Sequence, residues 1–138
     1  MNINILNKSL ITLKNGYEVL TTTHYENSAV NEMLADSCVK RFEYTIESSI
    51  KIMKRFLKKV YAVDEKDLTV NNAFRLMEGY GFITSWETWK LYYENRNNTA
   101  HEYDIDKSRE LLKFIPDFIE DATFLLENLK KKLEQSND

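Results

Sequence analysis

The chain has 138 residues, of which 43% are hydrophobic and 30% are charged, and its formal net charge is −3 at pH 7. Only 3 glycines and 1 proline are present, which argues against a turn-rich all-β fold, and the small negative charge provides no overall attraction to nucleic acid. We therefore expect a single all-α domain over residues 1–138, in which any contact with RNA comes from a local basic patch.

Further classes of protein are excluded by what the sequence lacks. Cys38 is the single cysteine, so an internal disulfide is impossible and a reducing compartment fits. Two histidines and one cysteine are too few for a zinc site, and there is no glycine-rich phosphate loop, so we expect neither a metal nor a cofactor. The chain has no secretory signal and no apolar run of membrane-spanning length, which predicts a cytoplasmic protein without membrane contact.

Apolar residues at spacings of three or four predict the first two helices. The first runs from Ile3 to Leu20, and the loop after it contains His24 and reaches Ser28. The second is long, from about Ser28 to Tyr61, and its core stripe consists of Val30, Leu34, Cys38, Phe42, Ile46, Ile50, Met53, Leu57 and Val60.

The outer face of the second helix carries the strongest positive charge in the chain. Between residues 40 and 59, seven basic residues stand against two acidic ones. Four of the basic residues share one side of the helix and are candidates for binding the phosphates of RNA or of a nucleotide: Lys51, Lys54, Arg55 and Lys58. The alternative is a solvated face whose cations are favourably placed near the carbonyl end of the helix.

The next two helices are predicted mainly from capping residues. A polar connection follows Asp64, and Thr69 is the expected N-cap of a third helix that ends at residues 79–81, Gly-Tyr-Gly. Thr84 and Glu87 form the expected capping box of the fourth helix.

The C-terminal part of the chain is also predicted to be helical. Asp104 is the expected cap of a fifth helix, and Pro116 is expected to kink that helix or to split it in two. Apolar residues continue at helical spacing to Leu133, before a tail that we expect to be frayed from Glu134 onward.

The side chains with the most useful chemistry are concentrated near the end of the fourth helix. Trp89, Tyr93 and Arg96 fall along one helical face, so Arg96 continues an apolar stripe. Its guanidinium is costly to desolvate unless it lines a cleft, pairs with a carboxylate or meets an anion. His101 is five residues further, about 140° around the axis and about 7.5 Å along it. Either the helix breaks after Asn97, or a second chain completes the site.

These residues supply what metal-free RNA cleavage needs. An imidazole such as that of His101 moves protons near neutral pH, and the Arg96 guanidinium offers forked donors to the phosphoryl oxygens. Asn97 is placed to orient His101 or the phosphate, and Tyr103 to donate to an oxygen or to stack on a base. The alternative is structural: Arg96 makes a salt bridge and His101 is a helix-terminal histidine.

The order of several short segments resembles a known family. Residues 96–103, Arg-Asn-Asn-Thr-Ala-His-Glu-Tyr, match R-x-x-x-x-H-x-Y, the signature of HEPN proteins encoded beside minimal nucleotidyltransferases (MNT). Residues 41–45 resemble the "RFEFT" helix of the nucleotidyltransferase substrate-binding protein branch, and residues 72–83 resemble its "AF…G-I" turn. Trp86 and the residues up to Asp104 match its "W…RN..H.YD" run, so the similarity extends from about Ser28 to the C-terminal helix.

This resemblance implies a fold and a function. The expected fold is an antiparallel up-and-down bundle of four to five helices that forms a homodimer. In such relatives Arg96 and His101 are the residues of a metal-independent endoribonuclease, assisted by Asn97. The protein would be the toxin of a toxin–antitoxin pair, and the partner nucleotidyltransferase, the antitoxin, would silence it by attaching adenylate to Tyr103.

Two other functions stay open at this point. The chain resembles a branch named for assisting its partner, so the first alternative is a non-catalytic subunit that binds nucleotide or substrate for a minimal nucleotidyltransferase. Arg96 and the basic face of the second helix would then hold phosphates. The second alternative is a helical dimer with a purely structural role.

Overall fold

The computed structural model describes residues 1–22, 28–101 and 105–136; within these ranges the side chains of residues 28, 98–101, 105–108 and 136 are not described. The described residues form six α-helices and one 3-10 helix and contain no strand, which confirms the all-α prediction. The elements are α1 (Asn4–Thr22), α2 (Ser28–Tyr61), η1 (Glu65–Asp67), α3 (Val70–Gly79), α4 (Trp86–His101), α5 (Ile105–Leu112) and α6 (Ile115–Ser136).

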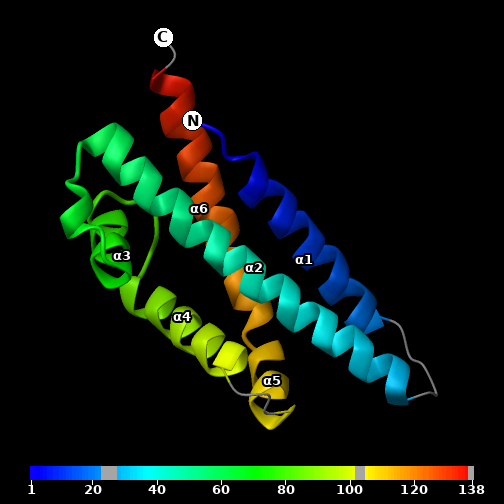
Figure 1. Ribbon diagram of the computed structural model, residues 1–138. Helices are drawn as coiled ribbons and strands as arrows, with labels where there is room; N and C mark the ends of the chain where they lie inside the picture. Colours follow the sequence, from blue (N-terminus) through cyan, green and yellow to red (C-terminus); the bar gives the residue numbers. More distant parts are fainter. Residues whose placement is uncertain (23–27, 102–104, 137–138) are drawn as a thin grey trace.

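The four longer helices, α1, α2, α4 and α6, run alternately up and down and form the predicted antiparallel bundle (Figure 1). The long helix α2 is central, since it packs against α1, α3, α4 and α5, while α1 also packs against α6. The start of α1 and the end of α6 lie at one end of the bundle, whereas α5 and the end of α4 lie at the other. None of the described helices is both long enough and apolar enough to cross a membrane.

The core is built around a cluster of aromatic rings from three helices. Phe118 of α6 makes edge contacts with Phe42 of α2, at 4.8 Å between ring centroids, and with Trp89 and Tyr92 of α4, at 5.6 and 5.1 Å. All four side chains are buried. Such ring pairs add a directional preference to the burial of apolar area. The cluster therefore fixes α4, the helix that carries Arg96, against α2 and α6.

Polar contacts hold α1 against α2. The Thr45 hydroxyl donates a hydrogen bond to the carbonyl oxygen of Ser9, at 3.3 Å, and the Arg41 guanidinium donates one to the carbonyl oxygen of Thr12, at 2.9 Å. A Cβ atom added at Gly16 would lie 2.7 Å from Nη1 of Arg41. Glycine at this position thus leaves room for Arg41 to lie across α1.

The signals at the ends of α3 are confirmed, but the predicted start of α4 is wrong by one residue. The Thr69 hydroxyl accepts a hydrogen bond from the backbone N–H of Asn72 at 3.2 Å, and Gly81 has a φ of +84°. At α4, however, Ser85 rather than Thr84 is the N-cap, because its hydroxyl accepts from the N–H of Thr88 at 3.2 Å. Both residues carry a suitable hydroxyl, so local preference alone does not distinguish them.

The C-terminal segment is split as predicted at Pro116. Helix α5 ends at Leu112 and α6 begins at Ile115, so the proline occupies the first turn of α6, where its missing N–H costs nothing. Fraying from Glu134 is not observed, since α6 continues to Ser136. The predicted cap Asp104 and the loop residue His24 lie outside the described residues.

Candidate functional site

Arg96 lies on a helix that continues without interruption to His101. Of the two alternatives for this stretch, a break of the helix after Asn97 is therefore not observed in the described backbone. The fourth helix keeps its 3.6-residue period, so the buried face that carries Trp89 also directs Arg96 inward, toward α2.

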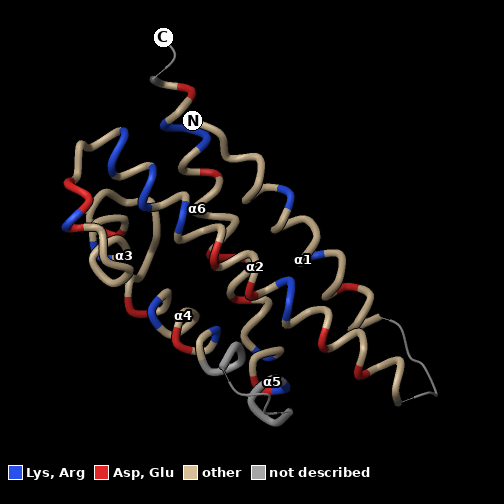
Figure 2. The backbone as a smooth tube through the Cα atoms, viewed as in Figure 1, with Lys and Arg blue, Asp and Glu red and all other residues tan. Residues whose placement is uncertain are grey.

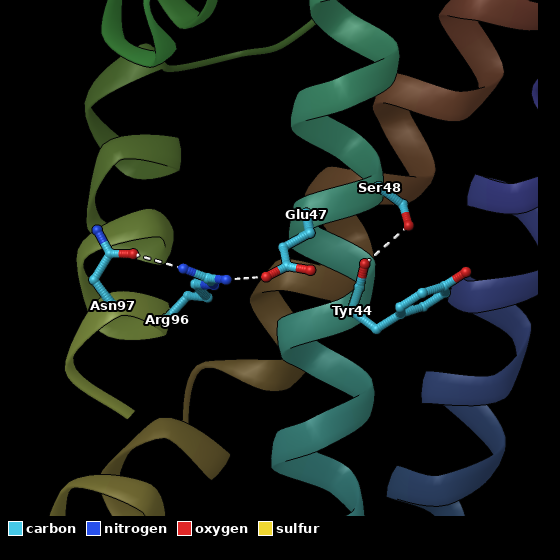
Figure 3. A network of polar contacts seen from close by, with 5 residues as sticks. All are labelled: Tyr44, Glu47, Ser48, Arg96 and Asn97. Atoms are coloured by element: carbon cyan, nitrogen blue, oxygen red, sulfur yellow. Dashed lines mark hydrogen bonds and ion pairs between the residues drawn. The ribbon is translucent and has the colours of Figure 1, made fainter. Parts of the chain in front are cut away.

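The guanidinium of Arg96 pairs with the carboxylate of Glu47 on α2, and its Nη1 donates a hydrogen bond to Oδ1 of the neighbouring Asn97 at 3.0 Å (Figure 3). The side chains of Arg96 and Glu47 are 23% and 40% exposed. Of the three environments considered for this arginine, the structure shows pairing with a carboxylate. A charge-assisted bond of this kind fixes the direction of the guanidinium while part of it stays accessible.

Asn97 supports Arg96 in this arrangement. Its side-chain oxygen accepts the hydrogen bond from the guanidinium, and both residues lie on the same turn of α4. Two of the predicted site residues, Arg96 and Asn97, are thus in direct contact. The proposed contact of Asn97 with His101 involves a side chain outside the described residues.

The structure places the backbone of His101 but describes neither its side chain nor any part of Tyr103. His101 is the last residue of α4, at the end of the bundle opposite the start of α1 (Figure 1). Positions 96 and 101 of an uninterrupted helix lie about 140° apart around its axis and about 7.5 Å apart along it. The geometric reason for expecting a second chain therefore holds for the backbone of α4.

The four candidate phosphate-binding residues lie in the C-terminal half of α2, where Lys51, Arg55 and Lys58 are exposed. Figure 2 shows the positions of Lys and Arg residues along this helix. Lys51 and Arg55 line a small cavity of about 150 Å³ that Glu47 also lines. Lys58 instead pairs with Glu65 at 3.4 Å, and both side chains are more than half exposed, so the pair contributes little stability. Lys54 is half-buried and lines neither of the two described cavities.

Two features of this region were not predicted from the sequence. Glu47 was counted only as an acidic residue in a basic stretch, and its pairing with Arg96 joins positions 49 residues apart, for which no local pattern exists. A larger cavity of about 480 Å³ between α1 and α2 was also missed. Lys40 and Arg41, which line this cavity, belong to the basic stretch of α2. The sequence pattern had assigned phosphate binding only to basic residues later in that stretch.

Two other titratable groups are unsuited to catalysis. Burial raises the pKa of the Tyr92 hydroxyl, and its 2.5 Å hydrogen bond to Asp121 and the negative charge of that residue raise it further. Burial also raises the pKa of the Cys38 thiol, which the charge of Arg41 only partly offsets. Both groups are therefore protonated near neutral pH, and the thiol is a poor nucleophile.

A helical up-and-down bundle whose third long helix carries Arg96 and ends at His101, in a sequence that reads R-x-x-x-x-H-x-Y from residue 96, is typical of a HEPN-type protein. The chain belongs to the family described as nucleotidyltransferase substrate binding protein like, whose model matches residues 1–131. It is similar to the probable ribonuclease HepT of Haemophilus influenzae, with 28% identity over 138 residues, 96% of this chain and 94% of that protein.

Solved structures agree with this assignment. One is a Haemophilus influenzae protein described as revealing the fold of a substrate binding domain of a nucleotidyltransferase. It superposes with a TM-score of 0.82 at 27% identity, over 94% of this chain and 99% of that one. A protein from Thermus thermophilus, with a TM-score of 0.73 at 21% identity over 90% of this chain and 98% of that one, shares the fold.

Proposed function

We propose that this chain is a metal-independent endoribonuclease that acts as a homodimer in the cytoplasm and is the toxin of a toxin–antitoxin pair. The proposal depends above all on Arg96, which the bundle fixes on α4 with its guanidinium held by Glu47 and Asn97. The similarity to a probable ribonuclease along nearly the whole chain supports it.

The chemistry follows from the residue types. The ribose 2′-hydroxyl attacks the adjacent phosphorus, a new O–P bond forms, and the bond from phosphorus to the 5′-oxygen breaks. His101 takes up the hydroxyl proton and delivers one to the leaving oxygen, while Arg96 stabilises the charge that develops on the phosphoryl oxygens. Glu47 holds the guanidinium in place until a phosphate replaces its carboxylate. The products are a 2′,3′-cyclic phosphate and a 5′-hydroxyl.

A homodimer supplies what one helix does not. Because α4 is continuous, the backbone positions of Arg96 and His101 point to different sides of the same helix. Two copies that meet along this end of the bundle bring an arginine from one chain near a histidine from the other. Each cleft of the dimer would then hold a complete pair.

The purified dimer is expected to cleave tRNA or mRNA in the presence of EDTA, because no step requires a metal. The products are expected to carry 2′,3′-cyclic phosphate and 5′-hydroxyl ends, which end-labelling and mass spectrometry distinguish. The His101→Ala variant, with its fold verified by circular dichroism, is the control for a contaminating nuclease. If a folded dimer leaves RNA intact where another metal-free ribonuclease cleaves it, the proposal is wrong.

We further propose that a partner nucleotidyltransferase silences the toxin by adenylylating Tyr103. Co-expression with a minimal nucleotidyltransferase encoded beside this chain is expected to add mass in steps of one adenylate. These steps are expected to vanish in Tyr103→Phe and to remain in Tyr80→Phe, which removes the hydroxyl of a different tyrosine, one whose side chain is exposed. Intact-mass spectrometry makes the measurement, and steps that persist in Tyr103→Phe would contradict the assignment.

A second candidate function is a non-catalytic subunit that binds nucleotide or substrate for a nucleotidyltransferase. It is favoured by the Glu47 carboxylate, which already neutralises Arg96, and by the description of the solved Haemophilus influenzae relative. This function requires tight association with the nucleotidyltransferase and nucleotide binding that is lost in Arg96→Ala, with RNA left uncut.

A further inference from the structure

The two cavities already described adjoin one another along the α1–α2 pair. The larger has a volume of about 480 Å³ and the smaller about 150 Å³, and both are lined by Ile5 of α1 and Tyr44 of α2. Because they share these two residues, they are adjacent, and we call them together the α1–α2 groove. The larger volume alone is in the range of small-ligand sites.

The charge of the groove is opposite to that of the chain. The larger cavity is lined by Lys8, Lys40 and Arg41 and by no carboxylate, although the chain as a whole has a net charge of −3. The smaller cavity adds two more cations, Lys51 and Arg55, and one carboxylate, Glu47, which is paired with Arg96. A concave surface lined by one sign of charge concentrates ligands of the opposite sign. The groove therefore favours an anion.

An exposed aromatic ring lies between the two groups of cations. Tyr44 is 56% exposed, and its ring projects from α2 toward α1, whereas Glu47 projects toward α4 (Figure 3). Ile5, on the opposite wall, is 59% exposed. A ring face with cations on both sides is the arrangement by which proteins hold single-stranded nucleic acid, since the ring stacks on a base and the cations contact phosphates.

The walls of the groove are fixed in place. Arg41 is anchored by its hydrogen bond to the carbonyl oxygen of Thr12, which takes one of the five N–H groups of the guanidinium. A hydrogen bond from the Thr45 hydroxyl to the carbonyl oxygen of the buried Ser9 also joins α2 to α1. A ligand would thus meet a preformed surface, which lowers the entropic cost of binding.

We propose that the α1–α2 groove binds the nucleotide units of a single-stranded RNA, with phosphates at Lys8, Lys40 and Arg41 and a base on Tyr44. The recognition of phosphate and base follows from the groove itself, whereas the choice of RNA over a free nucleotide rests on the proposed function. The smaller cavity of the groove also reaches Glu47, whose carboxylate pairs with Arg96, whereas Arg96 itself lines neither cavity.

The test measures binding separately from cleavage. A fluorescein-labelled octanucleotide with 2′-O-methyl groups has no attacking hydroxyl and stays intact, so fluorescence anisotropy with the wild-type chain gives a dissociation constant. Lys8→Glu and Tyr44→Ala are each expected to weaken binding about tenfold, because one removes a phosphate contact and the other a stacking surface. A fluorescent mononucleotide in the same assay shows whether a free nucleotide is also bound at this site.

Matched controls come from residues outside the groove. Lys14→Glu makes the same charge change at an exposed position of α1, and Phe124→Ala removes an aromatic ring that is 42% exposed on α6. Both are expected to change the dissociation constant less than about twofold. If the groove variants fold normally and bind both probes as tightly as these controls, the groove is not the site. A chain that binds but never cleaves RNA would disprove the nuclease and leave the groove assignment intact.

Discussion

The Arg96→Ala variant is expected to cleave RNA at least about 100-fold more slowly than the wild-type chain, because it lacks the guanidinium that we propose stabilises the charge on the transition-state phosphate. The same change removes the partner of Glu47, a carboxylate that is 40% exposed. Loss of that partner is expected to lower the free energy of unfolding by about 1 kcal/mol. A single variant therefore mixes a catalytic effect with a structural one.

A double-mutant cycle separates these two effects. In the Arg96→Ala/Glu47→Gln variant no carboxylate is left without its partner, so stability is expected to return toward that of the wild type while cleavage stays lost. Cleavage rates and urea unfolding of the four chains give both quantities. Lys90→Ala is the control on the same helix, since it breaks an exposed pair with Glu94 and should change neither. Recovery of cleavage in the double variant would mean that Arg96 only compensates Glu47.

The Phe118→Ala variant is expected to lose about 3–5 kcal/mol of unfolding free energy. The side chain is fully buried and contacts aromatic rings from α2 and α4, so truncation leaves a cavity where three helices meet. The midpoint of urea unfolding measures the loss.

Phe124→Ala is the matched control for this prediction, because it makes the same change on α6 at a side chain that is 42% exposed. Its loss is expected to be below about 1 kcal/mol. Equal losses in the two variants would show that the aromatic cluster does not hold the bundle together.

Much of the fold was predictable because its signals are local. The bounds of α2 follow from a long apolar stripe of regular period, and the ends of α3 follow from Thr69 and Gly81. Pro116 predicted the division of the C-terminal segment, because proline has no backbone N–H and cannot occupy the interior of a helix without distorting it. Local preference did not locate the start of α4, because two neighbouring hydroxyl residues were equally suitable and the N-cap is Ser85.

The site was predictable only in part, because side chains from different helices build it. Arg96 and Asn97 are neighbours in sequence, so their contact was within reach of a local pattern. Glu47 meets Arg96, and Lys8 of α1 meets the cations of α2, only when the helices pack, and no spacing along the chain indicates these contacts. The roles of His101 and Tyr103 remain predictions, since their side chains lie outside the described residues.

Helix α2 is continuous over 34 residues, about 51 Å, and this continuity links two regions that were described separately. Tyr44 in the groove and Glu47 beside Arg96 are less than one turn apart on the same rod. The angle between these two side chains around the helix axis is therefore set by the geometry of the continuous helix. Insertion of one residue between them would rotate everything downstream by about 100°. Between Tyr44 and Glu47, a substitution therefore preserves the relation between the groove and Arg96, whereas an insertion or deletion does not.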